Sequence, residues 1–163
     1  MLIRICYLLT ILSCTFSIDA HQMSTGYLHL DLSASKENAF HGQLQLRWFD
    51  LDSQIKLDKN LDGQLQWQEV ISRQTEIKQF IKSNLLMEIN QRPCALRILE
   101  ELGSTYHFDE GYMSSSFVSD CQVQNVNDIV INYSAIFAQD PEHKLIVNLT
   151  GTGSDATGIA SNV

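Results

Sequence analysis

The chain has 163 residues, of which 44% are hydrophobic, and this size and composition suit one globular domain with a single core. Lys and Arg number 11 against 19 Asp and Glu, which gives a formal net charge of -8 at pH 7. Because an acidic chain repels phosphate backbones and the sequence has no basic stripe interleaved with aromatic residues, we expect divalent cations as ligands and no nucleic-acid partner.

Residues 1–20 predict a cleaved signal peptide. A positive charge precedes a short apolar run at residues 5–11, and Ala20 ends a cleavage site, so the mature chain would begin at His21. The apolar run is far shorter than the roughly 20 residues that cross a bilayer. An alternative is a lipoprotein anchored at Cys14, which follows a loose processing motif. Both alternatives predict a periplasmic or secreted protein.

The cysteines indicate an oxidising compartment. Of the four in the sequence, Cys6 and Cys14 lie in the predicted leader, which leaves Cys94 and Cys121. We expect these two to form a disulfide because exported thiols usually oxidise, and on the chain-entropy model the bridge would stabilise the fold by roughly 3.5 kcal/mol. A two-cysteine metal site is the alternative, although neither cysteine belongs to a C-x-x-C motif.

Hydrophobic periodicity predicts two strands and then two helices. Apolar and polar residues alternate over residues 26–33 and 40–48, which is typical of half-buried strands, and the polar segment 35–38 between them predicts a hairpin. The period then changes. Residues 50–57 fit a short helix, and apolar residues recur at helical spacing over residues 67–85.

Strand signals return after the helical segment, residues 50–86. We therefore predict an α+β fold across residues 21–150, mainly an antiparallel β-sandwich with a helix-loop-helix (EF-hand-like) insertion after the second strand. The tail, residues 151–163, is rich in Gly, Ser and Thr and predicts a disordered segment or linker. The later strands are expected at residues 87–89, 95–102, 106–108, 116–121, 128–137 and 144–149.

The loop between the predicted helices, residues 58–69, has the spacing of an EF-hand calcium loop. Calcium takes six to eight oxygen ligands at about 2.3–2.6 Å, and such loops supply them from positions one, three, five, seven, nine and twelve. The residues at those positions are Asp58, Asn60, Asp62, Gln64, Gln66 and Glu69. We expect side-chain oxygens from the first three, the main-chain carbonyl of the fourth, the fifth directly or through water, and a bidentate carboxylate from the last.

Other positions of the loop bear on its affinity. Gly63 permits the sharp turn at position six. Leu61 occupies position four, where a bulky aliphatic residue is unusual, so either Leu61 packs on the neighbouring sheet or binding is weakened. Because the sequence has no second loop of this kind, we predict a structural site with a dissociation constant on the order of 10⁻⁴–10⁻³ M.

Several segments in this order resemble a known family. They are Ala20-His21, Met23-Ser24, the strand at residues 27–30, residues 46–52 running into Leu57-Asp58, residues 62–69, Cys94, Cys121 and the turn at residues 140–143. Over roughly residues 20–150 the chain is similar to the soluble exported N-terminal domain of HupE/UreJ-type membrane proteins, a family of nickel or cobalt transporters. The resemblance implies an accessory role beside a membrane transporter component.

Transition metals and catalysis are the remaining alternatives. His21, at the predicted mature N-terminus, is an alternative ligand for nickel, cobalt or copper through its ring and the free α-amine. The sequence contains no Gly-x-Ser-x-Gly elbow, phosphate-binding glycine loop or His-Glu-x-x-His motif, so we predict a binding or accessory module and no enzyme. The other histidines lack ligand spacing and are expected to be ordinary surface or strand residues: His29, His41, His107 and His143.

Overall fold

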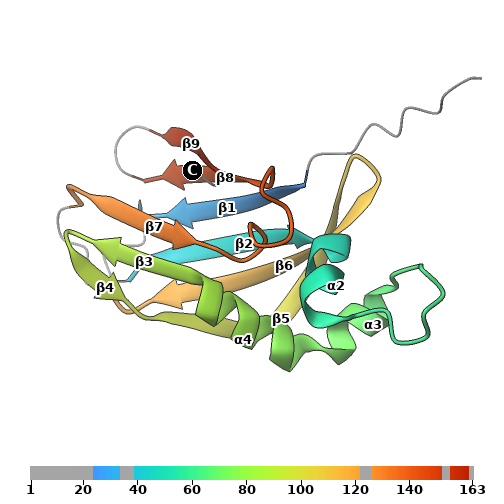
Figure 1. Cartoon of the computed structure of the whole chain (residues 1–163). Coiled ribbons are helices and arrows are strands. Elements are labelled where there is room, and N and C mark those ends of the chain that lie inside the picture. The colour runs from blue at the N-terminus through green and yellow to red at the C-terminus, as the bar shows by residue number, and fades with distance from the viewer. Residues whose placement is uncertain (1–23, 34–38, 122–125, 152–154, 162–163) are drawn as a thin grey trace, which may run out of the picture.

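The computed structural model describes residues 24–33, 39–121, 126–151 and 155–161 (Figure 1). Their strands form a six-stranded sheet in the order β5-β6-β2-β1-β8-β9 and a three-stranded sheet in the order β4-β3-β7. In chain order the elements are β1 (Thr25–Asp31), β2 (His41–Arg47), α2 (Trp48–Ile55), α3 (Trp67–Ser72), α4 (Gln74–Asn84), β3 (Leu85–Ile89), β4 (Arg92–Cys94), β5 (Leu96–His107), β6 (Glu110–Ser119), β7 (Ile129–Tyr133), β8 (Lys144–Thr150) and β9 (Ala156–Ser161).

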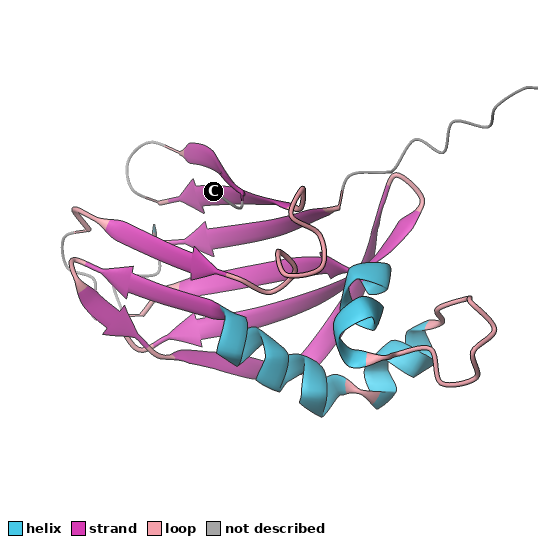
Figure 2. Cartoon of the chain, in the orientation of Figure 1, coloured by secondary structure: helices cyan, strands magenta, loops and turns pink. Residues whose placement is uncertain are grey.

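The predicted α+β sandwich is confirmed. All three described helices lie between the second and third strands, at one end of the two sheets (Figure 2). Strands β1 and β2 form the expected antiparallel hairpin, in which Leu28 pairs with Leu44. One pairing is parallel, because β8 returns alongside β1 in the same direction, with Leu28 opposite Val147.

The core lies between the sheets and continues under the helices. Every second residue of β1 and β2 is buried, as the alternating sequence predicts, and these side chains meet those of the small sheet. The helices extend the core with Leu51, Val70, Ile77 and Ile81. Burial of these apolar side chains drives the helical insertion onto the end of the sandwich.

The second predicted helix, residues 67–85, is two helices in the structure. The helix is interrupted at Arg73, which is both the C-cap residue of α3 and the N-cap residue of α4. Apolar spacing continues across the break, so periodicity alone gave no sign of it. The Arg73 guanidinium donates a hydrogen bond of 3.1 Å to the carbonyl of Ile55, which ties the start of α4 to the end of α2.

The prediction of a disordered tail is wrong for residues 156–161. Residues 156–161 form β9, which pairs antiparallel with β8 at the edge of the large sheet. Most of β9 is exposed, and only Ala160 packs against the core. Backbone hydrogen bonds to β8 therefore hold this strand, a contribution that composition does not reveal.

The predicted disulfide is confirmed. Cys94 and Cys121 are bonded, with their Cα atoms 5.2 Å apart. Cys94 ends β4 in the small sheet and Cys121 follows β6 in the large sheet, so the bridge joins the two sheets. No helix in the described part of the chain is long and apolar enough to cross a membrane.

Packing at Gly42 gives a test of the core. A Cβ atom at this position of β2 would overlap the fully buried ring of Phe117. We expect Gly42→Ala to lower the free energy of unfolding by about 1–3 kcal/mol, the usual cost of overpacking, as measured by urea denaturation. Gly103→Ala is the matched control, since its Cβ would come no closer than 3.7 Å to Ser114. Equal stabilities of the two variants would contradict this packing.

Candidate metal centre

The loop at residues 58–69 begins just after the C-terminus of α2, where the side chain of Asp52 in that helix accepts backbone hydrogen bonds. The helix ends at Ile55, and Lys56 follows with a left-handed φ of 60°. One carboxylate oxygen of Asp52 accepts hydrogen bonds from the backbone N–H groups of Leu57, at 2.6 Å, and Asp58, at 2.9 Å. These contacts fix the direction in which the chain enters the loop.

The first three predicted ligands accept backbone hydrogen bonds from within the loop. The two carboxylate oxygens of Asp58 accept the N–H groups of Leu61, at 2.7 Å, and Gly63, at 2.9 Å. Asn60 accepts the N–H of Asp62 at 2.9 Å, and Asp62 accepts the N–H of Gln64 at 2.8 Å. Because a carboxylate oxygen that accepts one N–H keeps a further lone pair, these groups retain the capacity to ligate a cation.

Glu69, at position twelve, reaches across the loop. One of its carboxylate oxygens accepts the N–H of Gln66 at 3.1 Å, in a capping box at the start of α3. The other lies 3.4 Å from the N–H of Lys59 near the start of the loop. A single side chain thus contacts both ends of the loop. Gly63 has a φ of 75°, as expected for the mid-loop turn.

The acidic side chains are near one another but not gathered around one point. Asn60 donates a hydrogen bond of 2.9 Å to Asp62, and Glu69 is engaged with backbone N–H groups. Among the residues that the structure describes, no three His, Cys, Asp or Glu side chains form a cluster that could hold a metal ion. The donor set consists of oxygens, which is the chemistry that calcium requires.

Leu61 does not pack on the sheet. Its side chain is 84% exposed, and its φ of 60° lies in the left-handed region that disfavours branched and bulky residues. The first of the two alternatives for this residue is therefore wrong. The left-handed backbone conformation of Leu61 is therefore strained, and its exposed side chain makes no packing contact that would offset the strain.

An aromatic stack connects the loop to the sandwich. Trp67, at loop position ten, is half-buried, and its ring lies 6.1 Å from that of Trp48, which is buried in the core. Tyr106, in the β5–β6 hairpin, contacts Trp48 edge-on with ring centroids 5.8 Å apart. Trp48 and Trp67 are the two tryptophans of the chain, so one indole fluorophore lies within the loop and the other stacks on it.

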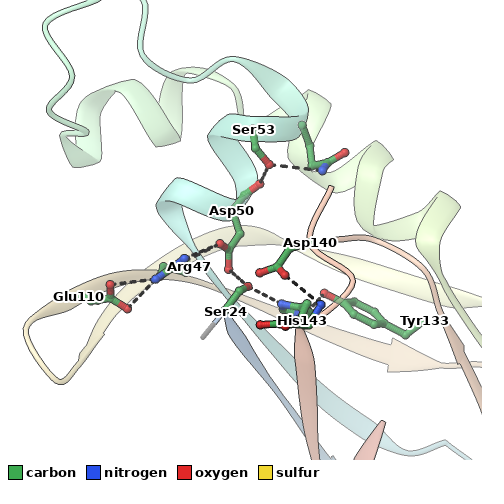
Figure 3. A network of polar contacts seen from close by, with 10 residues as sticks. Ser24, Arg47, Asp50, Ser53, Glu110, Tyr133, Asp140 and His143 are labelled. Carbon is green, nitrogen blue, oxygen red and sulfur yellow. Dashed lines mark hydrogen bonds and ion pairs between the residues drawn. The ribbon is translucent and has the colours of Figure 1, made fainter. Parts of the chain in front are cut away.

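A buried polar network lies at the other end of α2 (Figure 3). Asp50, in the first turn of α2, accepts hydrogen bonds from Arg47, at 2.9 Å, and from the hydroxyl of Ser24, at 2.6 Å. Arg47 also donates to Glu110, at 3.0 Å. Burial alone would lower the pKa of Arg47, but the two carboxylates outweigh it and raise that pKa. Arg47 therefore stays charged.

His143 completes the network and was wrongly predicted to be an ordinary surface or strand residue. It is 0% exposed, with Nδ1 2.5 Å from Ser24 Oγ and Nε2 3.1 Å from the hydroxyl of Tyr133. Gly26 lies beside the ring, and a Cβ there would come within 3.1 Å of the side chains of Leu46 and Leu145. The order differs from that of a hydrolytic triad, because serine stands between aspartate and histidine.

Some predicted residues fall outside the described part of the chain. His21, the signal peptide at residues 1–20 and the lipoprotein alternative at Cys14 all precede Ser24. In comparisons with known proteins, no family model and no curated protein matches this sequence. The resemblance to HupE/UreJ-type proteins stays an expectation.

The strain at Leu61 predicts a stabilising substitution. Leu61→Gly should raise the free energy of unfolding by up to about 1 kcal/mol, because relief of the left-handed conformation exceeds the greater flexibility of glycine in the unfolded chain. Denaturant titration in chelator would measure the change. Leu61→Ala is the control, since it removes the exposed side chain but keeps Cβ. A gain in the alanine variant as large as that in the glycine variant would rule out backbone strain as the cause.

Proposed function

We propose that this protein is an exported calcium-binding module in which calcium at residues 58–69 has a structural role. The observation that carries the proposal is the carboxylate of Glu69, which contacts the backbone at both ends of a loop with EF-hand spacing. The two carboxylate oxygens of Asp58 also accept hydrogen bonds at positions four and six. Calcium would bind to the oxygens of these side chains and fasten the start of α3 to the end of α2.

Charge favours the same function. Asp58, Asp62 and Glu69 bring three carboxylates into twelve residues, and the chain as a whole carries -8. Repulsion among them opposes the closed loop, and a divalent cation would remove it. Calcium suits the site better than magnesium, since the predicted bidentate Glu69 fits a flexible cage of many oxygens, whereas magnesium demands tight octahedral geometry.

The Cys94–Cys121 disulfide supports export, because such bonds persist in oxidising compartments. Extracellular and periplasmic modules operate at calcium concentrations that suit a dissociation constant on the order of 10⁻⁴–10⁻³ M. In such a compartment the ion would act through mass action on the folded state. An accessory role beside a membrane transporter, with His21 as a nickel, cobalt or copper ligand, is the alternative that the resemblance implies.

A calcium titration tests the main proposal. In about 5 mM calcium, the protein spanning residues 21–163 should gain about 1–2 kcal/mol of stability over the same protein in chelator, and its melting temperature should rise by a few degrees. The tryptophan emission should change with the same dissociation constant, since Trp67 lies within the loop and stacks on Trp48. Both effects should be absent in Asp58→Asn/Glu69→Gln.

The control for that double variant removes the same charge elsewhere. Asp109→Asn/Glu101→Gln neutralises two exposed carboxylates outside the loop and should keep the full response to calcium. Equal loss in both double variants would indicate unspecific charge screening, and no response in the native chain would refute the calcium site. A nickel arm of the titration addresses the alternative, for which His21→Ala should abolish binding.

A further inference from the structure

The network around His143 has no part in the proposed calcium site, yet it joins four separate parts of the fold. Ser24 precedes β1, Asp50 lies in α2, Tyr133 ends β7 and His143 precedes β8. The backbone N–H of Lys144 also donates to the carbonyl of Ser24 at 3.0 Å. These contacts hold the start of β1 and the base of the helical insertion against the β7–β8 connection (Figure 3).

The hydrogen bonds determine where the protons lie. Ser24 has one hydroxyl proton and donates it to Asp50, so its oxygen accepts from His143. Nδ1 of His143 therefore carries a proton, and Nε2 is the acceptor for the hydroxyl of Tyr133. Every group is satisfied when His143 is neutral and Asp50 is ionised. A second ring proton would occupy the nitrogen that accepts from Tyr133.

The surroundings of His143 oppose a positive charge on balance. Its ring contacts those of Tyr133 and Phe137, with centroids 5.6 Å and 5.5 Å apart. Burial is the largest influence and lowers the pKa of His143 below 6.5; Asp50 and Asp140 act in the opposite direction, and Arg47 reinforces burial. Glu110 is paired with Arg47, and burial raises the pKa of Tyr133, which therefore stays protonated.

We propose that Ser24, Asp50, Tyr133 and His143 form an acid-sensitive latch. Protonation of His143 deprives the Tyr133 hydroxyl proton of its acceptor Nε2 and places a charge in a buried site, so acid releases the start of β1 and the base of α2 from the β7–β8 connection. The latch contains no proposed calcium ligand, because none of these residues belongs to the loop at residues 58–69.

The direction of the pH effect follows from linkage. When the pKa of a histidine is depressed in the folded state, the folded state keeps its full stability at pH values above the ordinary pKa of 6.5. As the pH falls below that value, the unfolded chain takes up a proton that the folded chain does not. The ratio of folded to unfolded protein then falls by up to about tenfold per pH unit, until the folded state is protonated at its lower pKa.

Two measurements in chelator test the latch. NMR titration of the native protein should give a pKa below 6.5 for the His143 ring. Hydrogen exchange of the Lys144 N–H, corrected for the intrinsic rate, should accelerate between pH 7 and pH 5. In His143→Gln, whose amide can donate to Ser24 and accept from Tyr133, this acceleration should disappear. His107→Gln is the matched control, since His107 is half-buried and bonded to Gln45.

Each outcome decides the proposal. A His143 pKa at or above 6.5 in the folded protein overturns it, and that measurement does not depend on any variant folding. Equal acid acceleration in the native protein and His143→Gln also overturns it. Acceleration that is lost in His143→Gln and kept in His107→Gln establishes the latch.

Discussion

The buried carboxylate of Asp50 determines where the helical insertion docks on the sandwich. It is 6% exposed, and it accepts hydrogen bonds from Arg47 and Ser24. A charge removed from water costs several kcal/mol unless it is paired and hydrogen-bonded. Arg47 is the N-cap residue of α2 and stays beside Asp50, so the distant partner Ser24 restricts where α2 can lie. Burial of Leu51 and Trp48 on the same helix favours docking but does not select one orientation of the helix. The hydrogen bond from Ser24 to Asp50 selects that orientation.

The same helix positions the candidate loop. Asp52, two residues after Asp50, accepts the N–H groups at the start of the loop. Arg73, between α3 and α4, donates a hydrogen bond to the carbonyl of Ile55 at the end of α2. Glu69 then contacts both ends of the loop through its carboxylate. The backbone of the loop is therefore held by the protein's own hydrogen bonds. A cation would add ligand bonds to a shaped loop and would not have to order an extended chain, which lowers the entropic cost of binding.

The sequence predicts what is local and misses what is assembled from distant segments. The loop ligands lie within twelve residues, and their spacing is sufficient to identify them. Strand alternation likewise predicts the β1–β2 hairpin. By contrast, Ser24 and His143 are separated by 119 positions, and only the pairing of β1 with β8 brings them together. No local pattern distinguishes the buried His143 from an exposed histidine. The break at Arg73 was missed for a different reason, since apolar spacing continues through it.

The loop at residues 58–69 and the network around His143 stabilise their charged groups in different ways. The loop exposes several carboxylates to water, where repulsion is moderate and a cation from solution can offset it. The network places an aspartate paired with Arg47 and a histidine out of water, where the position of each proton decides whether all groups are satisfied. Because these sites lie at opposite ends of α2, changes in cation concentration and in pH would both act on the helical insertion.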